Sequence, residues 1–435
     1  METKSPKNEY WVNSLTFKMV VIGVMILLLL IPLSMIKRII AERESTSLQV
    51  ENDISAQWGH AQVLAGPILN IPTEHSSVDK NGNVIIERDW LHIMPSNLKV
   101  ATQLDPEIRY RGIFKTAVYT SVSQITGNFK FVLNPEEIVG TPDWSKAVVT
   151  FGISDNRGIR GDIRILWNNF ALEPESGMLT QNITKSGFTI KTPIGVADLE
   201  KSIPFSINLE LSGSKSFTIL PLGQKSSIDI SSSWTNPSFS GNLLPQKRNI
   251  SETGFDANWQ LTHLNRNFPQ YWQGSKFNVW EHSLGVDLFL PVNHYQKATR
   301  SAKYGILFII LTLLVFLFIE LINNKKVHLF QYLLVGLALI LFFSLLTALS
   351  EHTGFNLAYL IASVVNIVVI GLFAYGLLQD FRLTSWVVGL LVLMYTFLFV
   401  LLQLNDLAFL AGNIGLVIIL SIIMKASLRL TSQSS

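Results

Sequence analysis

Residues 331–363 read QYLLVGLALILFFSLLTALSEHTGFNLAYLIAS. Residues 331–349 contain no acidic or basic side chain, and a second uncharged run extends from Leu357 to Leu378. A helix needs about 20 apolar residues to cross a hydrocarbon core that is about 30 Å thick. The two runs therefore predict a pair of transmembrane helices. The polar residues Ser350-Glu351-His352-Thr353 between them predict a tight turn at the membrane boundary.

Four further apolar runs have similar lengths. One lies near the N-terminus, Met19–Ile36, and three lie in the same C-terminal third as the pair above: Tyr304–Ile322, Leu383–Leu402 and Leu407–Met424. Lys18 precedes the first run and Lys37-Arg38 follow it, without a cleavage site of small residues, so we expect an uncleaved anchor. Buried helices of a soluble protein are the alternative interpretation. The runs are too long and too closely spaced to favour it.

The region between the anchor and the later runs has the pattern of a β-rich domain. Phe205–Leu211 alternates strictly between apolar and polar residues, which predicts a strand with one buried face. Asn81-Gly82 and Asp155–Gly158 predict turns, and so does Ser212-Gly213-Ser214-Lys215, which also fits a Ser-x-x-Lys pattern by chance. Many short strands with such turns favour a sandwich-like arrangement. Ile39–Ala61 has helical spacing and predicts an extension of the anchor helix.

We therefore expect a membrane α + β fold with a large extracytoplasmic domain. The predicted order is a cytoplasmic tail (1–18), a transmembrane anchor helix (19–38), a periplasmic β-rich domain (39–302), a bundle of five transmembrane helices (303–425) and a cytoplasmic tail (426–435). Lys325-Lys326, Arg382, Lys425 and Arg429 lie on one set of connections, and the opposite loops lack Lys and Arg. Cytoplasmic loops carry the excess of Lys and Arg, so both termini are expected inside.

Composition excludes several classes of function. Of the 435 residues, 15% are charged, against about 25% in soluble domains. The absence of cysteine excludes disulfides, thiolate catalysis and Cys-ligated zinc. The net charge is +3 with scattered Lys and Arg, so we expect no nucleic-acid partner.

Motifs for catalysis are not found either. The eight histidines never occur at i, i+3 or i, i+4 spacing, and neither His-Glu-x-x-His nor a phosphate-binding glycine loop occurs. The sequence therefore predicts no catalytic residue, no cofactor and no metal.

Four residues remain as candidates for a functional role: Glu351, His352, Asn366 and Asn413. Glu351 and His352 are expected at the outer membrane boundary, where they bind the outside domain, titrate with external pH, or only form a polar turn. Asn366 and Asn413 lie within apolar runs, where asparagine commonly joins helices by hydrogen bonds. Glu320 is expected near the end of its helix, close to Lys325, paired at the interface.

Several stretches together resemble the CreD family of bacterial inner-membrane proteins. They are LIPLSMIKRIIAER (30–43), AGPILNIP (65–72), SDNRG (154–158), WTNPSFSGNLLP (234–245), GFDANW (254–259) and the opening stretch 331–363. The resemblance covers the anchor, the β-rich region and the bundle in one order. It implies a cytoplasmic-membrane protein linked to envelope integrity, controlled in some bacteria by the CreBC two-component system and associated with altered β-lactam and colicin tolerance. It transfers no catalytic residue.

We accordingly expect a non-enzymatic inner-membrane protein that supports envelope integrity under stress and antimicrobial challenge. Its expected partners are the lipid bilayer and envelope or membrane proteins, and its oligomeric state is open. One alternative is a transporter or channel that uses the C-terminal bundle, and it would need a water-lined path past Asn366 or Asn413. The other is an enzyme acting on envelope polymers, which would need clustered Asp, Glu or His in a cleft.

Overall fold

The computed structural model describes residues 15–78, 84–192, 194, 198, 200–288, 290, 294–323 and 327–404, with positions 410, 412–415, 417, 418, 421 and 424 beyond them. The predicted turn at Asn81-Gly82, the Lys325-Lys326 pair, both terminal tails and most of the run Leu407–Met424 lie outside these residues. The chain divides into two compact units, which we name the membrane unit (Met1–Ser47 with Val292–Ser435) and the β unit (Leu48–Pro291).

Long apolar helices make up the membrane unit. Five helices of the described chain are long and apolar enough to cross a bilayer: the N-terminal helix α2 and four C-terminal helices. The bounds are α2 (Leu15–Trp58), α4 (Gly305–Asn323), α5 (Leu329–Thr353), α6 (Phe355–Leu378) and α7 (Phe381–Gln403), preceded by the short α3 (His294–Lys303). The helical spacing in 39–61 agrees with the continuation of α2 to Trp58.

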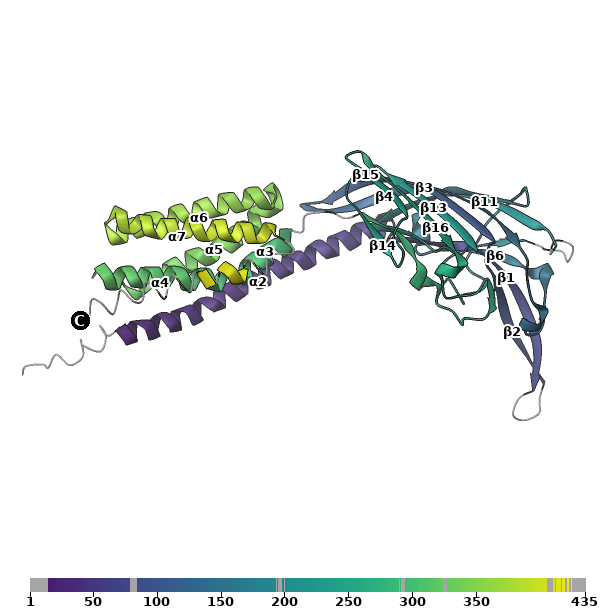
Figure 1. Ribbon diagram of the computed structural model, residues 1–435, viewed down its shortest axis with the longest axis horizontal. Helices are drawn as coiled ribbons and strands as arrows, with labels where there is room; N and C mark the ends of the chain where they lie inside the picture. Colours follow the sequence, from purple (N-terminus) through teal and green to yellow (C-terminus); the bar gives the residue numbers. More distant parts are fainter. Residues whose placement is uncertain are drawn as a thin grey trace, which may run out of the picture. The chain divides into compact units, whose positions relative to one another are not determined.

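The four C-terminal helices lie side by side, with α4 beside α5 and α7, and α6 between α5 and α7 (Figure 1). Small residues permit this packing. Ala358 and Ala362 of α6 are fully buried, and Leu29 of α2 packs so closely on Gly336 of α5 that a Cβ there would collide with it. Close approach of this kind is typical of membrane helices, which gain little from burying one apolar surface against another.

Two sheets form the β unit. The first has the order β14-β18-β12-β1-β6-β10-β9, with β2 and β5 paired to β1 and β17 paired to β2. Its strands are β1 (Gln62–Val78), β2 (Val84–Ile93), β5 (Thr141–Pro142), β6 (Val148–Ile153), β9 (Glu175–Ser176), β10 (Gly187–Lys191), β12 (Ser216–Ile219), β14 (Pro237–Gly241), β17 (Tyr271–Gln273) and β18 (Leu284–Leu288).

The second sheet has the order β15-β16-β13-β3-β4-β11-β7-β8. Its strands are β3 (Asn97–Arg111), β4 (Phe114–Lys130), β7 (Ile159–Trp167), β8 (Phe170–Leu172), β11 (Ser202–Ser214), β13 (Lys225–Ser232), β15 (Lys247–Ser251) and β16 (Gly254–Thr262). Inward residues of both sheets belong to one hydrophobic core, in which Trp259 and Phe217 are fully buried. The β-rich, sandwich-like architecture predicted for this region is thus present.

Alternation along the strands explains which face of the second sheet is buried. In β16, Phe255, Ala257 and Trp259 point into the core, and Asp256 and Asn258 point outward. Successive side chains of a strand point to opposite faces, so this register leaves a row of polar groups in solvent on every second position.

The predicted turn at Ser212-Gly213-Ser214 is wrong. These residues continue β11, which pairs with β4 as far as Ser214, and the chain turns only at Lys215, where φ is +66°. Both serines are buried and donate hydrogen bonds to backbone carbonyls, Ser212 to Trp58 and Ser214 to Gly59. The polar side chains that suggested a turn instead satisfy the carbonyls of the last residue of helix α2 and of the residue after it.

Candidate functional site

Glu351 and His352 lie in the last turn of α5, so the prediction that they form an interhelical turn is wrong by a few residues. Gly354, at φ +81°, makes the actual break before α6. Glu351 accepts a hydrogen bond of 2.9 Å from the Tyr295 hydroxyl of α3, whereas His352 is exposed. Burial, followed by the Glu351 carboxylate, raises the pKa of Tyr295 above its usual range.

A polar layer surrounds this contact where α3 meets the ends of three spanning helices. Arg300 donates to the Leu404 carbonyl at 3.2 Å, and Gln403 donates to Asn356 at 2.8 Å. The Lys297 ammonium lies 5.3 Å from the centroid of the Phe355 ring. Glu351 therefore takes part in holding α3 against the helix ends.

Asn366 joins three helices. Its side-chain amide donates to the Ala338 carbonyl of α5 at 2.6 Å and accepts from the Tyr395 hydroxyl of α7 at 3.1 Å. Tyr359 of α6 in turn donates to the Tyr395 carbonyl at 2.7 Å. This is the structural role that asparagine commonly has between membrane helices.

Asn413 follows α7 in the chain. It is exposed within the helical residues 412–415, where Gly415 packs against the Phe397 ring of α7. The hydrogen bonds of Glu351 and Asn366 belong to separate clusters, so the structure does not gather the candidate residues into one site.

Glu320 has a different partner from the one that its position in the sequence suggested. It is buried, and its carboxylate lies 2.7 Å from the Lys18 ammonium of α2 and accepts a hydrogen bond of 2.7 Å from Tyr332 of α5. This cluster ties the N-terminal helix to two helices of the bundle. Lys18 and Glu320 are separated by 302 positions, so nothing local in the sequence indicated the pair.

A second buried polar cluster lies in the β unit. His92 of β2 has its Nδ1 2.6 Å from Asn70 Oδ1 and its Nε2 3.2 Å from Asn182 Nδ2. Because Asn70 uses its amide nitrogen to donate to Thr150 and Ile68, its oxygen is left to accept from His92. This network selects the neutral imidazole, and burial lowers the pKa of His92 to about 4. A satisfied histidine of this kind is a structural feature of the core.

A run of polar side chains lies on the outward face of the second sheet. We name this surface the polar face. It comprises these polar outward residues of β4, β3, β13, β16 and β15, which are amides, hydroxyls and charged groups: Asn97, Lys99, Gln103, Gln124, Thr126, Lys225, Ser227, Asp229, Ser231, Lys247, Asn249, Asp256, Asn258 and Gln260.

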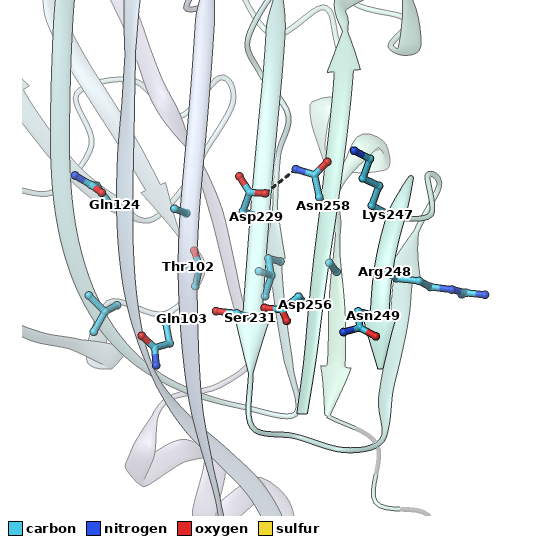
Figure 2. Close-up of a pocket in the computed structure, with 14 residues that line it drawn as sticks. Thr102, Gln103, Gln124, Asp229, Ser231, Lys247, Arg248, Asn249, Asp256 and Asn258 are labelled. Atoms are coloured by element: carbon cyan, nitrogen blue, oxygen red, sulfur yellow. Dashed lines mark hydrogen bonds between the residues drawn. The ribbon is translucent and has the colours of Figure 1, made fainter. Parts of the chain in front are cut away.

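Two hollows interrupt the polar face, with volumes of about 570 and 530 Å³. Figure 2 shows the first one, where Asn258 donates to Asp229 across neighbouring strands at 2.6 Å. The strand register places Ala101 between Asp229 and Gln124. The short side chain of Ala101 leaves the space that its larger neighbours surround.

The groups around the first hollow differ from those around another hollow of the β unit. That hollow, of about 1120 Å³, is lined by Glu74, Arg88 and Lys146 among others, and its charges are paired within the chain, as in the Arg88–Glu74 contact of 2.9 Å. In the first hollow, Gln103 and Gln124 make no side-chain hydrogen bond with any described residue. Polar groups without internal partners are available to a ligand.

Within the described residues, no three His, Asp or Glu side chains gather in a way that could hold a metal ion. The hollows are lined by amide, hydroxyl, carboxylate and ammonium groups together with apolar residues such as Ala101, Val122 and Leu98. Such donors and acceptors suit recognition of a polar ligand by hydrogen bonds.

Comparison with known proteins gives one family. The family model described as "Inner membrane protein CreD" matches residues 14–431. The chain is 32% identical over 415 residues to the inner membrane protein CreD of Escherichia coli (strain K12), and the match covers 94% of this chain and 92% of that protein. The similarity thus extends over both units.

Proposed function

Because the chain belongs to the CreD family of inner membrane proteins, we propose that it supports the integrity of the bacterial cell envelope under stress, without catalysing a reaction. The observation that carries this proposal is the match to the family over residues 14–431, which includes both the spanning helices and the β unit. A role confined to one unit would not require similarity along the whole chain.

In the proposed orientation, both termini are cytoplasmic and the β unit is periplasmic. The positions of Lys325-Lys326, Arg382, Lys425 and Arg429 support it, because short cytoplasmic connections carry the excess of basic residues. The β unit would then meet envelope polymers and the outer domains of other membrane proteins, and the membrane unit would hold it at the bilayer.

The contacts of the membrane unit favour an anchoring role over transport. Transport through the bundle would need polar groups that exchange partners with a solute. Asn366, the best placed of these by sequence, already binds Ala338 and Tyr395, with Tyr359 packed beside them. Glu320 is neutralised by Lys18 in the same manner. Intramembrane polar groups with such fixed partners stabilise helix packing.

Deletion of the gene tests the proposed role. The deletion strain is compared with its parent and with a strain carrying Glu351→Ala/His352→Ala, under detergent, bile salts and a β-lactam. We expect the deletion to sensitise the cells, and we expect the double variant to restore tolerance because Glu351 only positions α3. A deletion strain that tolerates every stress as well as its parent would remove the support for an envelope role.

The absence of cysteine makes the orientation simple to test, because one introduced thiol is the only thiol in the protein. Thr253→Cys, in the exposed turn between β15 and β16, is expected to react with a membrane-impermeant maleimide in cells whose outer membrane is permeable to it. Ser434→Cys, in the C-terminal tail, is expected to react only after the inner membrane is disrupted. The opposite pattern would overturn the proposed orientation.

A further inference from the structure

We infer that the polar face binds an uncharged glycan chain, with the hollow at Ala101 as its central subsite (Figure 2). The inference deepens the proposed function and rests on its periplasmic placement of the β unit, because it names the class of envelope polymer that this unit would contact. It is argued from the arrangement of side chains on β4, β3, β13 and β16.

The charges on the polar face indicate a ligand of low net charge. Across both hollows, the carboxylates of Asp229 and Asp256 stand against the ammonium groups of Lys99, Lys225 and Lys247, so three positive charges face two negative ones and the sum is +1. Arg248 also borders the first hollow, but its side chain points away from the other lining groups (Figure 2). Binding of a polyanion needs a cluster of cations that this balance does not supply.

The central strands of the polar face are closed to a peptide that would bind by strand addition, and of the strands on this face only β15 lies at an edge of the sheet. β3 and β13 each pair with a neighbour on both sides, and so does β16, which lies between β13 and β15. Their N–H and C=O groups are therefore used inside the sheet, whereas a peptide that adds as a strand needs a free edge. A ligand that lies over β3, β13 and β16 is therefore recognised by side chains.

The lining side chains match hydroxyl and acetamido groups. Gln103 and Gln124 each present a donor and an acceptor, and Asp229, held by Asn258, presents an acceptor at the opposite side of Ala101. Two strand spacings separate the Asp229 row from the Gln124 row, about 10 Å in all. A sugar ring lying over the Ala101 methyl group would place its equatorial substituents toward both rows.

The two hollows follow each other along β3, which provides for more than one sugar unit. Asn97 and Lys99 line the second hollow, and Ala101 and Gln103 line the first. The six residue-to-residue steps of the extended strand from position 97 to position 103 span about 20 Å. The site thus has the length for an oligosaccharide that runs along the strand direction.

Binding of defined oligosaccharides to the purified full-length protein in detergent tests this inference. The probes are chitohexaose, which carries acetamido groups, and cellohexaose, which carries only hydroxyls, with single-stranded DNA and a Ser/Asn-rich peptide as ligands of other classes. We expect chitohexaose to bind, cellohexaose to bind more weakly, and the DNA and the peptide not to bind.

Two variants locate the binding. Ala101→Tyr fills the hollow, and Asp229→Asn removes the carboxylate charge while preserving the shape of the side chain. Each substitution is expected to weaken chitohexaose binding at least about tenfold, equivalent to about 1.4 kcal/mol. Leu166→Tyr is the matched control, because Leu166 is exposed on the same face but lies on β7, two strands from β4 and outside both hollows, and it is expected to bind as the wild type does. Asp229→Asn keeps the test informative if Ala101→Tyr does not fold.

Three results would overturn the inference: no binding of either glycan by the folded wild-type protein, unchanged binding by both hollow variants, or binding of the DNA or peptide in place of the glycans. A failure of this kind leaves the proposed envelope role standing, because the deletion phenotype is measured separately. Conversely, glycan binding without a deletion phenotype would preserve the site and remove the proposed physiological role.

Discussion

Acidification is expected to destabilise the β unit through His92. This side chain is buried and neutral, with Nδ1–H donating to Asn70 and Nε2 accepting from Asn182. The ring of Trp272, which is uncharged, lies 5.7 Å from the imidazole. Protonation would place a second N–H against the amide of Asn182, which is itself a donor, and would leave a charge in the core without a counterion.

The size of the effect follows from the pKa of His92 in the two states. The pKa is about 4 in the folded protein and 6.5 in the unfolded chain. Each pKa unit corresponds to about 1.4 kcal/mol. The free energy of unfolding is therefore about 3 kcal/mol higher when His92 is neutral than when it is protonated. Because the folded pKa is the lower one, this stability is fully present above pH 6.5 and is lost as the pH falls toward 4. About 2 kcal/mol of it is gone at pH 5.

Urea unfolding of the full-length protein in detergent measures this loss, with tryptophan fluorescence as the signal because Trp259 and Trp272 are buried in the β unit. His92→Asn is expected to be less stable at pH 8, but its stability should change by about 3 kcal/mol less than that of the wild type between pH 8 and pH 4. His75→Asn is the control. His75 contacts the exposed Glu87, so its replacement leaves the packing around His92 unchanged. Equal pH dependence of the wild type and His92→Asn would refute the reasoning.

Three further predictions concern the membrane unit. Glu320→Ala should destabilise the membrane unit by about 3–5 kcal/mol in thermal unfolding, because Lys18 is left without its partner. Exchange of the two charges in Lys18→Glu/Glu320→Lys should recover part of this loss, and no recovery would argue against a direct pair. Asn366→Leu should cost about 1–2 kcal/mol and leave any solute flux unchanged, and a changed flux in proteoliposomes would instead favour a transport path. Gly336→Val should separate α2 from α5 at Leu29 and so make the N-terminal helix more sensitive to protease than in the wild type. Equal sensitivity of the variant and the wild type would contradict this contact.

The architecture of the chain could be predicted because its signals are local. The uncharged runs at 331–349 and 357–378 match the thickness of a bilayer, and the alternation at Phe205–Leu211 matches the pleat of a strand. Both patterns depend only on neighbouring residues and on the solvent that each face meets. Within the described residues, four long apolar helices follow the β unit, and β11 (Ser202–Ser214) contains the alternating segment.

Local signals fail where a residue has a distant partner. Ser212 and Ser214 have the composition of a turn, yet they extend β11, because their hydroxyls can reach the carbonyls after helix α2. Glu351 was expected in a turn and lies in the last turn of α5, since helix propagation through two polar residues is favourable until Gly354 ends it. In both cases tertiary contacts outweigh a weak local preference.

By itself, therefore, the sequence determined the spanning segments, the β-rich class of the large domain and the resemblance to a family, all of which follow from hydrophobic pattern and short motifs. Only the tertiary structure decided which polar groups meet: Glu320 with Lys18, Asn366 with Tyr395, and His92 with Asn70 and Asn182. It also decided that Ala101 lies between Asp229 and Gln124. The physical reason is that a buried hydrogen bond or ion pair depends on geometry between elements far apart in the chain, and chain neighbours carry no information about that geometry.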